Sequence, residues 1–161
     1  MTVDGTDFRI LEPVAFNPGW YSHKFKGPGV RYEVAISIKG GDIVSINGPF
    51  PCGSHPDRTI FNLCLKEELE EWEFVVADSG YRGDHAMTPT GLNNLTDRMC
   101  AMRRAQHQNI NHRFKEFNCL KNCYRHDRNE HYNFFAPVVL LVQLCMEREG
   151  AMFNFDYIEN L

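Results

Sequence analysis

A β-hairpin is the feature of this sequence that most restricts its fold. In "VRYEVAISIKGGDIVSINGPF", residues 30–50, Val34, Ile36 and Ile38 point to one side, and "KGGD" supplies a turn before the chain returns through 43–46. The preceding stretch "TVDGTDFRI", residues 2–10, alternates well enough to form another strand. The chain is therefore expected to begin with three strands in an antiparallel meander.

A short apolar run, "EFVVAD" at 73–78, predicts a buried strand of a different kind. A helix is expected before it, from Pro56-Asp57 onward, with Ile60, Leu63, Cys64 and Leu69 on its apolar side. A strand that follows a helix crossover is typically parallel to its neighbour, so we expect residues 73–78 to lie parallel to the first strand.

Two further helices are expected, at about 95–118 and 131–147. Ile110, Phe114 and Phe117 share the buried side of the first of these. The residues expected to pack the second into the core are Phe134, Phe135, Val138, Leu141, Val142 and Cys145. The predicted fold class is α/β, a mixed sheet flanked by helices, in one domain over 1–161.

Composition sets outer limits on function. The 161 residues are 43% hydrophobic and contain no apolar run of membrane-spanning length. The N-terminus has no secretory signal, so a nuclear or cytoplasmic location is expected and the six cysteines are interpreted as free thiols. Trp20 and Trp72 are interpreted as packing residues.

The charge distribution is more informative than the net charge of −4. Between residues 98 and 128 there are eight arginines and lysines against Glu116 and Asp127, which leaves 8 − 2 = 6 positive charges. Such a strip is either a solvated helix surface or a surface that faces nucleic-acid phosphates, and charge alone does not decide between them.

Two aspartates on separate strands suggest a metal site. Asp4 lies on the first strand and Asp78 ends the apolar run, so adjacent strands would bring the two carboxylates together. Oxygen ligands of this kind suit Mg²⁺ or Mn²⁺, and a third would come from a following helix. Aspartates at strand ends are, however, more often turn residues or helix caps.

Five strings occur in an order that is typical of one family. They are "VDGTDFRI" (3–10), "WYSHKFKGPGVRYEVAI" (20–36), "INGPFPCGSHPD" (46–57), "VVADSGYRG" (75–83) and "HQNINHRFKEFNCL" (107–120). Together they resemble the DDE superfamily endonuclease domain of PIF/Harbinger-like transposases and proteins derived from them. The resemblance implies an RNase H-like fold and metal-dependent cleavage and transfer of DNA strands, with two ions in an active enzyme.

The resemblance also implies a set of catalytic, metal-binding residues. The first acid falls on Asp4 in "DGT" and the second on Asp78 in "ADSGY". The third position, a glutamate in the family pattern, falls on Gln108, which lies 108 − 78 = 30 residues beyond Asp78. His107, Asn111 and the run 113–115 keep the pattern around it.

The amide at Gln108 predicts impaired catalysis. Glutamine keeps a carbonyl oxygen that can bind a metal but brings no charge, so a second cation would be held less well. Glu116 lies about 12 Å further along the helix axis, too far to substitute. Asp84 and Asp97 lie on or beside a loop and could swing inward. The alternative function is a catalytically inactive, domesticated domain that binds DNA or protein.

Other residues have both a functional and a structural interpretation. The candidate DNA contacts are Lys24, Lys26, Arg104, Arg113 and Lys115. His55 and Asp57 in "GSHPD" either line the active site or form a turn and an N-cap. Cys119, Cys123, His126 and His131 suggest zinc, but the two pairs are too close together for a usual finger.

No DNA-recognition module is expected ahead of the first strand. The first acid is four residues from the start of the sequence. Proteins of this kind need such a module or a separate recognition protein to find their target. We therefore expect weak DNA binding without sequence preference, through the basic strip, and a homo-oligomer is a further possibility.

Overall fold

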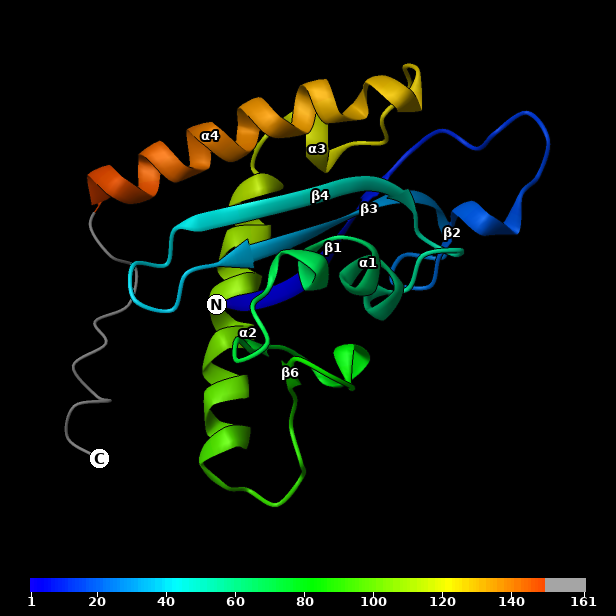
Figure 1. Ribbon diagram of the computed structural model, residues 1–161. Coiled ribbons are helices and arrows are strands. Elements are labelled where there is room, and N and C mark those ends of the chain that lie inside the picture. Colours follow the sequence, from blue (N-terminus) through cyan, green and yellow to red (C-terminus); the bar gives the residue numbers. More distant parts are fainter. Residues whose placement is uncertain (150–161) are drawn as a thin grey trace.

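The computed structural model describes residues 1–149, and their elements form a six-stranded mixed sheet flanked by helices (Figure 1). The strands are β1 (Thr2–Arg9), β2 (Tyr21–Ser22), β3 (Gly27–Ile36), β4 (Ile43–Pro51), β5 (Val75–Val76) and β6 (Ala86–Met87). The α-helices are α1 (Asp57–Leu63), α2 (Leu95–Phe114), α3 (Asn118–Lys121) and α4 (His131–Glu149). Short 3₁₀ helices are η1 (Pro18–Trp20), η2 (Leu65–Glu68), η3 (Ser79–Tyr81) and η4 (Arg128–Glu130).

The strand pairing confirms the predicted mixed α/β sheet. The strand order is β2-β3-β1-β5-β6, and β4 pairs with the other side of β3. β1 and β3 pair antiparallel without a register shift from Thr2↔Ile36 to Arg9↔Gly29. β5 lies parallel to β1, as the helix between them predicted. The last twelve residues of the expected domain, 150–161, lie outside the described residues.

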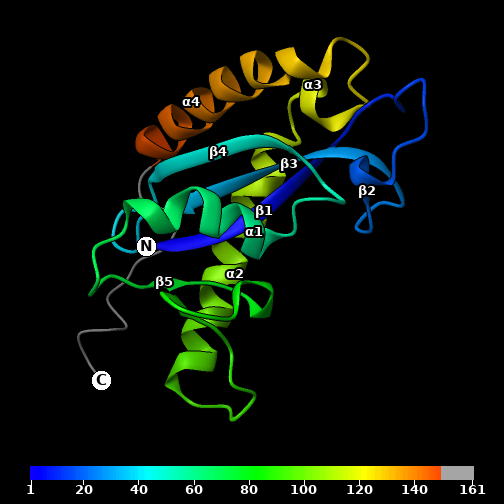
Figure 2. The same ribbon diagram turned by 45° about the vertical axis from the view of Figure 1, so that its right-hand side comes forward.

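Helices cover both faces of this sheet (Figures 1 and 2). In both views α2 crosses behind β3, whereas α1 lies in front of β1. α2 and α4 share one core cluster with β1 and β3, in which Phe8, Tyr32, Phe114 and Phe135 are buried. A second core cluster, on the other face, contains Val3 of β1, Phe61 of α1 and Tyr81 of η3. The sheet is thus the middle layer, with α2 and α4 on one face and α1 on the other.

Several boundaries and orientations differ from the predictions. Ile38 lies in the turn after β3 rather than in the strand. On α1, Phe61 is buried and Leu63 is 59% exposed, because the helix ends at Leu63 and its inner side is set by Ile60 and Phe61. The expected helix over 95–118 ends at Phe114, since Phe117 has an extended backbone that precedes the separate helix α3.

The packing of α4 was predicted only in part. Phe135, Val138 and Val142 are buried as expected. Phe134 and Leu141 are 41% and 48% exposed, and Cys145 is exposed too, because they lie on the side of α4 that faces away from the sheet. Trp72, expected to pack, is 75% exposed, whereas Trp20 packs against the core cluster and lies under Arg128. No helix among residues 1–149 is both long and apolar enough to cross a membrane.

Glu33 is, like Asp7, an acidic side chain buried within the sheet. Glu33 pairs with Gly5 across β1 and β3 and is 1% exposed. Asn47 donates a hydrogen bond to its Oε1, while Oε2 has no hydrogen-bond partner among the described residues. Burial raises the pKa of Glu33 to about 7, Asn47 opposes that shift, and the charges of Asp57 and Glu68 add to it.

Replacing a core aromatic residue should destabilise the fold far more than replacing an outward-facing leucine. Phe114→Ala is expected to lower the free energy of unfolding by about 3–5 kcal/mol, because the ring is fully buried and stacks edge-on against Phe135. Leu141→Ala, on the exposed side of α4, is the control and should change it by no more than about 0.5 kcal/mol. Urea denaturation of both variants measures this, and equal losses would contradict the orientation of α4.

Glu33 should make stability depend on pH. An unfolded glutamate releases its proton near its ordinary pKa, whereas Glu33 in the folded chain keeps it up to about pH 7. The folded state is therefore favoured below about pH 4.5, and its stability declines as the pH rises through 7. Glu33→Gln removes this loss, so we expect its melting temperature to exceed that of the wild type by several degrees at pH 8 and to differ little at pH 5. A pH-independent difference in thermal denaturation would contradict the assignment.

Candidate functional site

The pairing of β1 with β5 positions the two predicted aspartates. Thr2 pairs in parallel with Val76, and the amide of Val76 donates to the carbonyl oxygen of Met1. Asp4 lies two residues further along β1, Asp78 lies two residues beyond the end of β5, and both line one cavity. Asp78 caps η3, since its Oδ1 accepts a hydrogen bond from the amide of Gly80 at 2.8 Å. The Asp4 carboxylate accepts one from the amide of Gly5, also at 2.8 Å.

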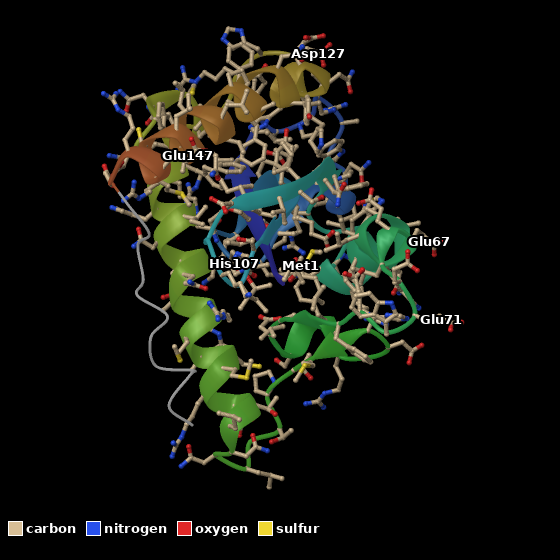
Figure 3. The ribbon with its side chains drawn as sticks, turned by 60° about the vertical axis from the view of Figure 1, so that its left-hand side comes forward. Met1, Glu67, Glu71, His107, Asp127 and Glu147 are labelled. Carbon is tan, nitrogen blue, oxygen red and sulfur yellow. The ribbon has the colours of Figure 1, made fainter. Side chains whose placement is uncertain are left out.

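A buried histidine sets α2 against the start of β1. His107 Nε2 and Thr2 Oγ1 share a hydrogen bond of 2.7 Å, and both side chains are buried. Burial lowers the pKa of His107 to about 4, so its ring is neutral at physiological pH. Figure 3 shows His107 on α2 beside Met1 at the start of β1. Gln108 follows His107 on the helix and is exposed, as its position off the apolar side predicted.

Two adjoining cavities bring the three predicted positions together. One, of about 330 Å³, is lined by Asp4, Asp78 and Gln108, with Lys24 and Arg104 also in its wall. The other, of about 440 Å³, shares Asp4, Lys24 and Gln108 and continues along α2 to Asn111 and Lys115. The combined groove runs from the carboxylates along one side of α2, and cationic side chains line it on both sides of Gln108.

Asp4 lies in an environment that disfavours its charged form. Burial raises its pKa to about 6, Lys24 and the Gly5 amide oppose the shift, and the neighbouring charges of Asp57 and Asp78 add to it. Lys24 lies close to the strand, because its Nζ donates to the carbonyl oxygen of Gly5 at 2.7 Å. Burial and the neighbouring carboxylates thus disfavour the charge on Asp4, and a bound cation would favour it.

A further acidic residue approaches from the other face of the sheet. Asp57 begins α1, and its Oδ1 lies 3.2 Å from Nη1 of Arg31 but accepts no hydrogen bond. Arg31 instead directs two hydrogen bonds to Asp7, from Nε at 2.7 Å and Nη2 at 3.0 Å. Burial opposes ionisation of Asp7, but these bonds, Lys24 and Ser22 together lower its pKa. Burial raises the pKa of Asp57 in spite of Arg31 and Lys24.

The role of Asp57 is not the one its sequence position favoured. The N-cap of α1 is Pro56, and no side chain caps the helix. A turn followed by an N-cap therefore does not account for Asp57. It also lines neither cavity, and its carboxylate instead lies against Gly5. In the sequence, the glycine of "DGT" was the available signal of this contact, because a Cβ at Gly5 would overlap Asp57 Oδ1.

The candidate DNA contacts divide into two groups. Lys24, Arg104 and Lys115 line the groove, and Lys115 also lies over the ring of Phe8. Lys26 and Arg113 line neither cavity. Arg113 forms an ion pair with Glu149 of α4, with Nη2 and Oε2 2.6 Å apart.

The acids considered as substitutes for Gln108 have other partners. Asp84 is 85% exposed and lies 3.9 Å from Lys66 Nζ. Asp97 accepts hydrogen bonds from Thr90 and from the amide of Asn93 at the start of α2. Glu116 lies 3.8 Å from His112. None of the three lines either cavity.

The cysteine–histidine segment forms no metal site in the part of the chain that the structure describes. Cys119 and Cys123 are exposed, and all six cysteines are free. His131 is fully buried, with its Nδ1 2.9 Å from the hydroxyl of Tyr32. Over residues 1–149 no three His, Cys, Asp or Glu side chains come close enough to hold one ion together. Any ion at Asp4 and Asp78 would therefore need the Gln108 oxygen, water or substrate to complete its ligands.

Comparison with known proteins agrees with this geometry. The family model described as DDE superfamily endonuclease matches residues 3–143, which span β1 through most of α4. Comparisons with curated proteins and with solved structures give no match. Endonucleases of this superfamily generally use divalent metal ions and act on DNA. Because the match covers most of the sequence, the chain belongs to the DDE superfamily endonuclease family.

Proposed function

We propose that this chain is a transposase-derived, metal-dependent DNA endonuclease domain whose catalysis is impaired by Gln108. The observation that carries the proposal is that Asp4 and Asp78, each two residues beyond the paired position of β1 and β5, line one groove together with Gln108. Family membership supports the reaction class, and the cationic walls of the groove support a phosphate-bearing substrate.

The residues of the groove fit a hard divalent cation. Asp4, Asp78 and Gln108 offer only oxygen donors, which suits Mg²⁺ or Mn²⁺ better than zinc. The raised pKa of Asp4 reflects first its burial and then the neighbouring charges of Asp57 and Asp78, and a bound cation would favour the ionised form of the carboxylate. When bound, divalent ions in such a site activate water and stabilise the entering and leaving oxygens at a phosphodiester.

The side chains of this chain have separable tasks in that reaction. Asp4 and Asp78 would hold the cation; the backbone of Asp4 is fixed by pairing with β3, and that of Asp78 by the turn that begins η3. Lys24 and Arg104 would bind the phosphates on either side of the scissile bond. His107 is neutral and therefore does not repel a cation. Its hydrogen bond to Thr2 holds α2 in place beside β1.

Gln108 weakens this site by removing one charge. A neutral ligand offsets less of the repulsion between two cations, so the second ion is held less well than with glutamate. This is also the observation that favours the alternative function, a catalytically inactive domain that keeps the groove for binding DNA or protein. The two functions share the fold and differ in whether strand cleavage is measurable.

Restoring the acid should restore cleavage. Gln108→Glu is expected to raise the rate of Mn²⁺-dependent nicking of supercoiled plasmid by about tenfold or more over the wild type, as expected for a regained metal ligand. Asp78→Asn in the Gln108→Glu background is the control and should abolish the gain. Equal, robust nicking by wild type and Gln108→Glu would contradict impairment, whereas no nicking by either would favour the binding module.

DNA affinity should depend on the side chains of the groove. Arg104→Ala is expected to weaken binding of nonspecific duplex DNA several-fold and to reduce the slope of log affinity against log salt by about 1, as for one lost phosphate contact. Arg113→Ala, which removes the partner of Glu149, is the matched control and should leave that slope unchanged. Fluorescence anisotropy at several salt concentrations measures both, and identical slopes for the two variants would contradict the proposed DNA surface.

A further inference from the structure

We propose that the Asp57 carboxylate supplies the negative charge that Gln108 lacks, acting as a positioning residue for the cation held by Asp4 and Asp78. This inference rests on the proposed function and names a residue of the same site that the three-acid pattern does not contain. Asp57 would act from beyond the direct ligands, through water, because no three acidic or other metal-binding side chains within residues 1–149 converge on one ion.

The position of Asp57 follows from two glycines. Asp57 Oδ1 occupies the space that a Cβ at Gly5 would fill, so it packs against the backbone directly after Asp4. Its Oδ2 lies 3.6 Å from the Cβ position of Gly80, a position that is also 2.9 Å from Asp78 Oδ1. The Asp57 carboxylate therefore packs against Gly5, next to Asp4, and lies near Gly80, two residues from Asp78. It comes from the opposite face of the sheet to Gln108 and lines neither cavity.

The charge of Asp57 is only partly balanced. Arg31 commits Nε and Nη2 to Asp7, and its Nη1 donates to the carbonyl oxygen of His55 at 3.3 Å. The contact of Nη1 with Asp57 is an ion pair without a hydrogen bond. The four carboxyl groups of Asp4, Asp7, Asp57 and Asp78 thus face three basic groups, those of Arg31, Lys24 and Lys115. The surplus lies toward Asp4 and Asp78 because Asp7 has the better hydrogen bonds.

Several buried polar groups around Asp57 have no hydrogen-bond partner among the described residues. Tyr81 is fully buried, and its hydroxyl has no hydrogen-bond partner in the described part of the chain. Asp57 Oδ1 and Glu33 Oε2 are likewise unsatisfied. A carboxylate kept solely for stability would be expected to satisfy such groups, since each unsatisfied one costs about 1–3 kcal/mol. A charge kept for a cation beside it accounts for the arrangement.

The decisive experiment is a double-mutant cycle on Mn²⁺ affinity, measured by isothermal titration calorimetry at pH 7.5 on the folded proteins. Asp57→Asn keeps the shape of the side chain and is expected to weaken Mn²⁺ binding about tenfold or more. In the Gln108→Glu background the same change should cost only a few-fold, because the third charge is then present on α2. Asp84→Asn, an exposed carboxylate, is the matched control and should leave affinity unchanged.

The outcomes separate this inference from the function on which it rests. An equal loss from Asp57→Asn in both backgrounds, or no loss in either, overturns the role of Asp57 while Asp78→Asn still abolishes binding. Absence of Mn²⁺ binding in wild type and in Gln108→Glu alike overturns the proposed metal site itself, and the inference falls with it.

A second measurement covers the case in which Asp57→Asn does not fold. The side-chain carboxyl ¹³C resonances of Asp57 and Asp84 are followed in wild-type protein during a Mg²⁺ titration. A saturable shift at Asp57 with the midpoint of metal binding, and none at Asp84, supports the proposal. A resonance of Asp57 that does not move while Asp4 and Asp78 respond overturns it.

Discussion

The short parallel contact between β1 and β5 is the constraint on which the site depends. It consists of one paired position, Thr2↔Val76, supported by the bond from the Val76 amide to the Met1 carbonyl. β1 is secured independently by its long antiparallel pairing with β3. Asp4 is therefore fixed by the body of the sheet, while Asp78 is fixed by two residues of strand and by the turn that follows. The position of one acid relative to the other is set by the least extensive pairing that involves β1.

Much of this arrangement follows from the sequence because the patterns concerned are local. Alternation predicted β3 and β4, and an apolar run after a helix predicted a strand parallel to β1. The position of Gln108 off the buried side of its helix predicted an exposed side chain, and the structure confirms it. The family resemblance named the positions of the groove, and the family match supports that resemblance.

What the sequence could not supply were contacts between distant segments. Nothing near Asp57 in the chain reveals that α1 packs against Gly5, because that contact needs the sheet to be assembled first. Arg113 follows the family pattern as closely as its neighbours do, yet its pairing with Glu149 depends on the crossing of α2 and α4. The outward orientation of Leu141 similarly depends on which side of α4 meets the sheet. Hydrophobic periodicity identifies the apolar side of a helix, but α4 has apolar residues on both its buried and its exposed side.

The glycine of the "DGT" motif has a consequence beyond its own strand. With no side chain at Gly5, α1 comes near enough for a carboxylate to rest on the backbone of β1. Because Gly5 has no Cβ, a charge on the α1 face of the sheet lies close enough to act on groups at the other face. A side chain at Gly5 would move Asp57 away from β1, and it would thereby alter the electrostatic potential at the groove without changing any charged residue of the groove.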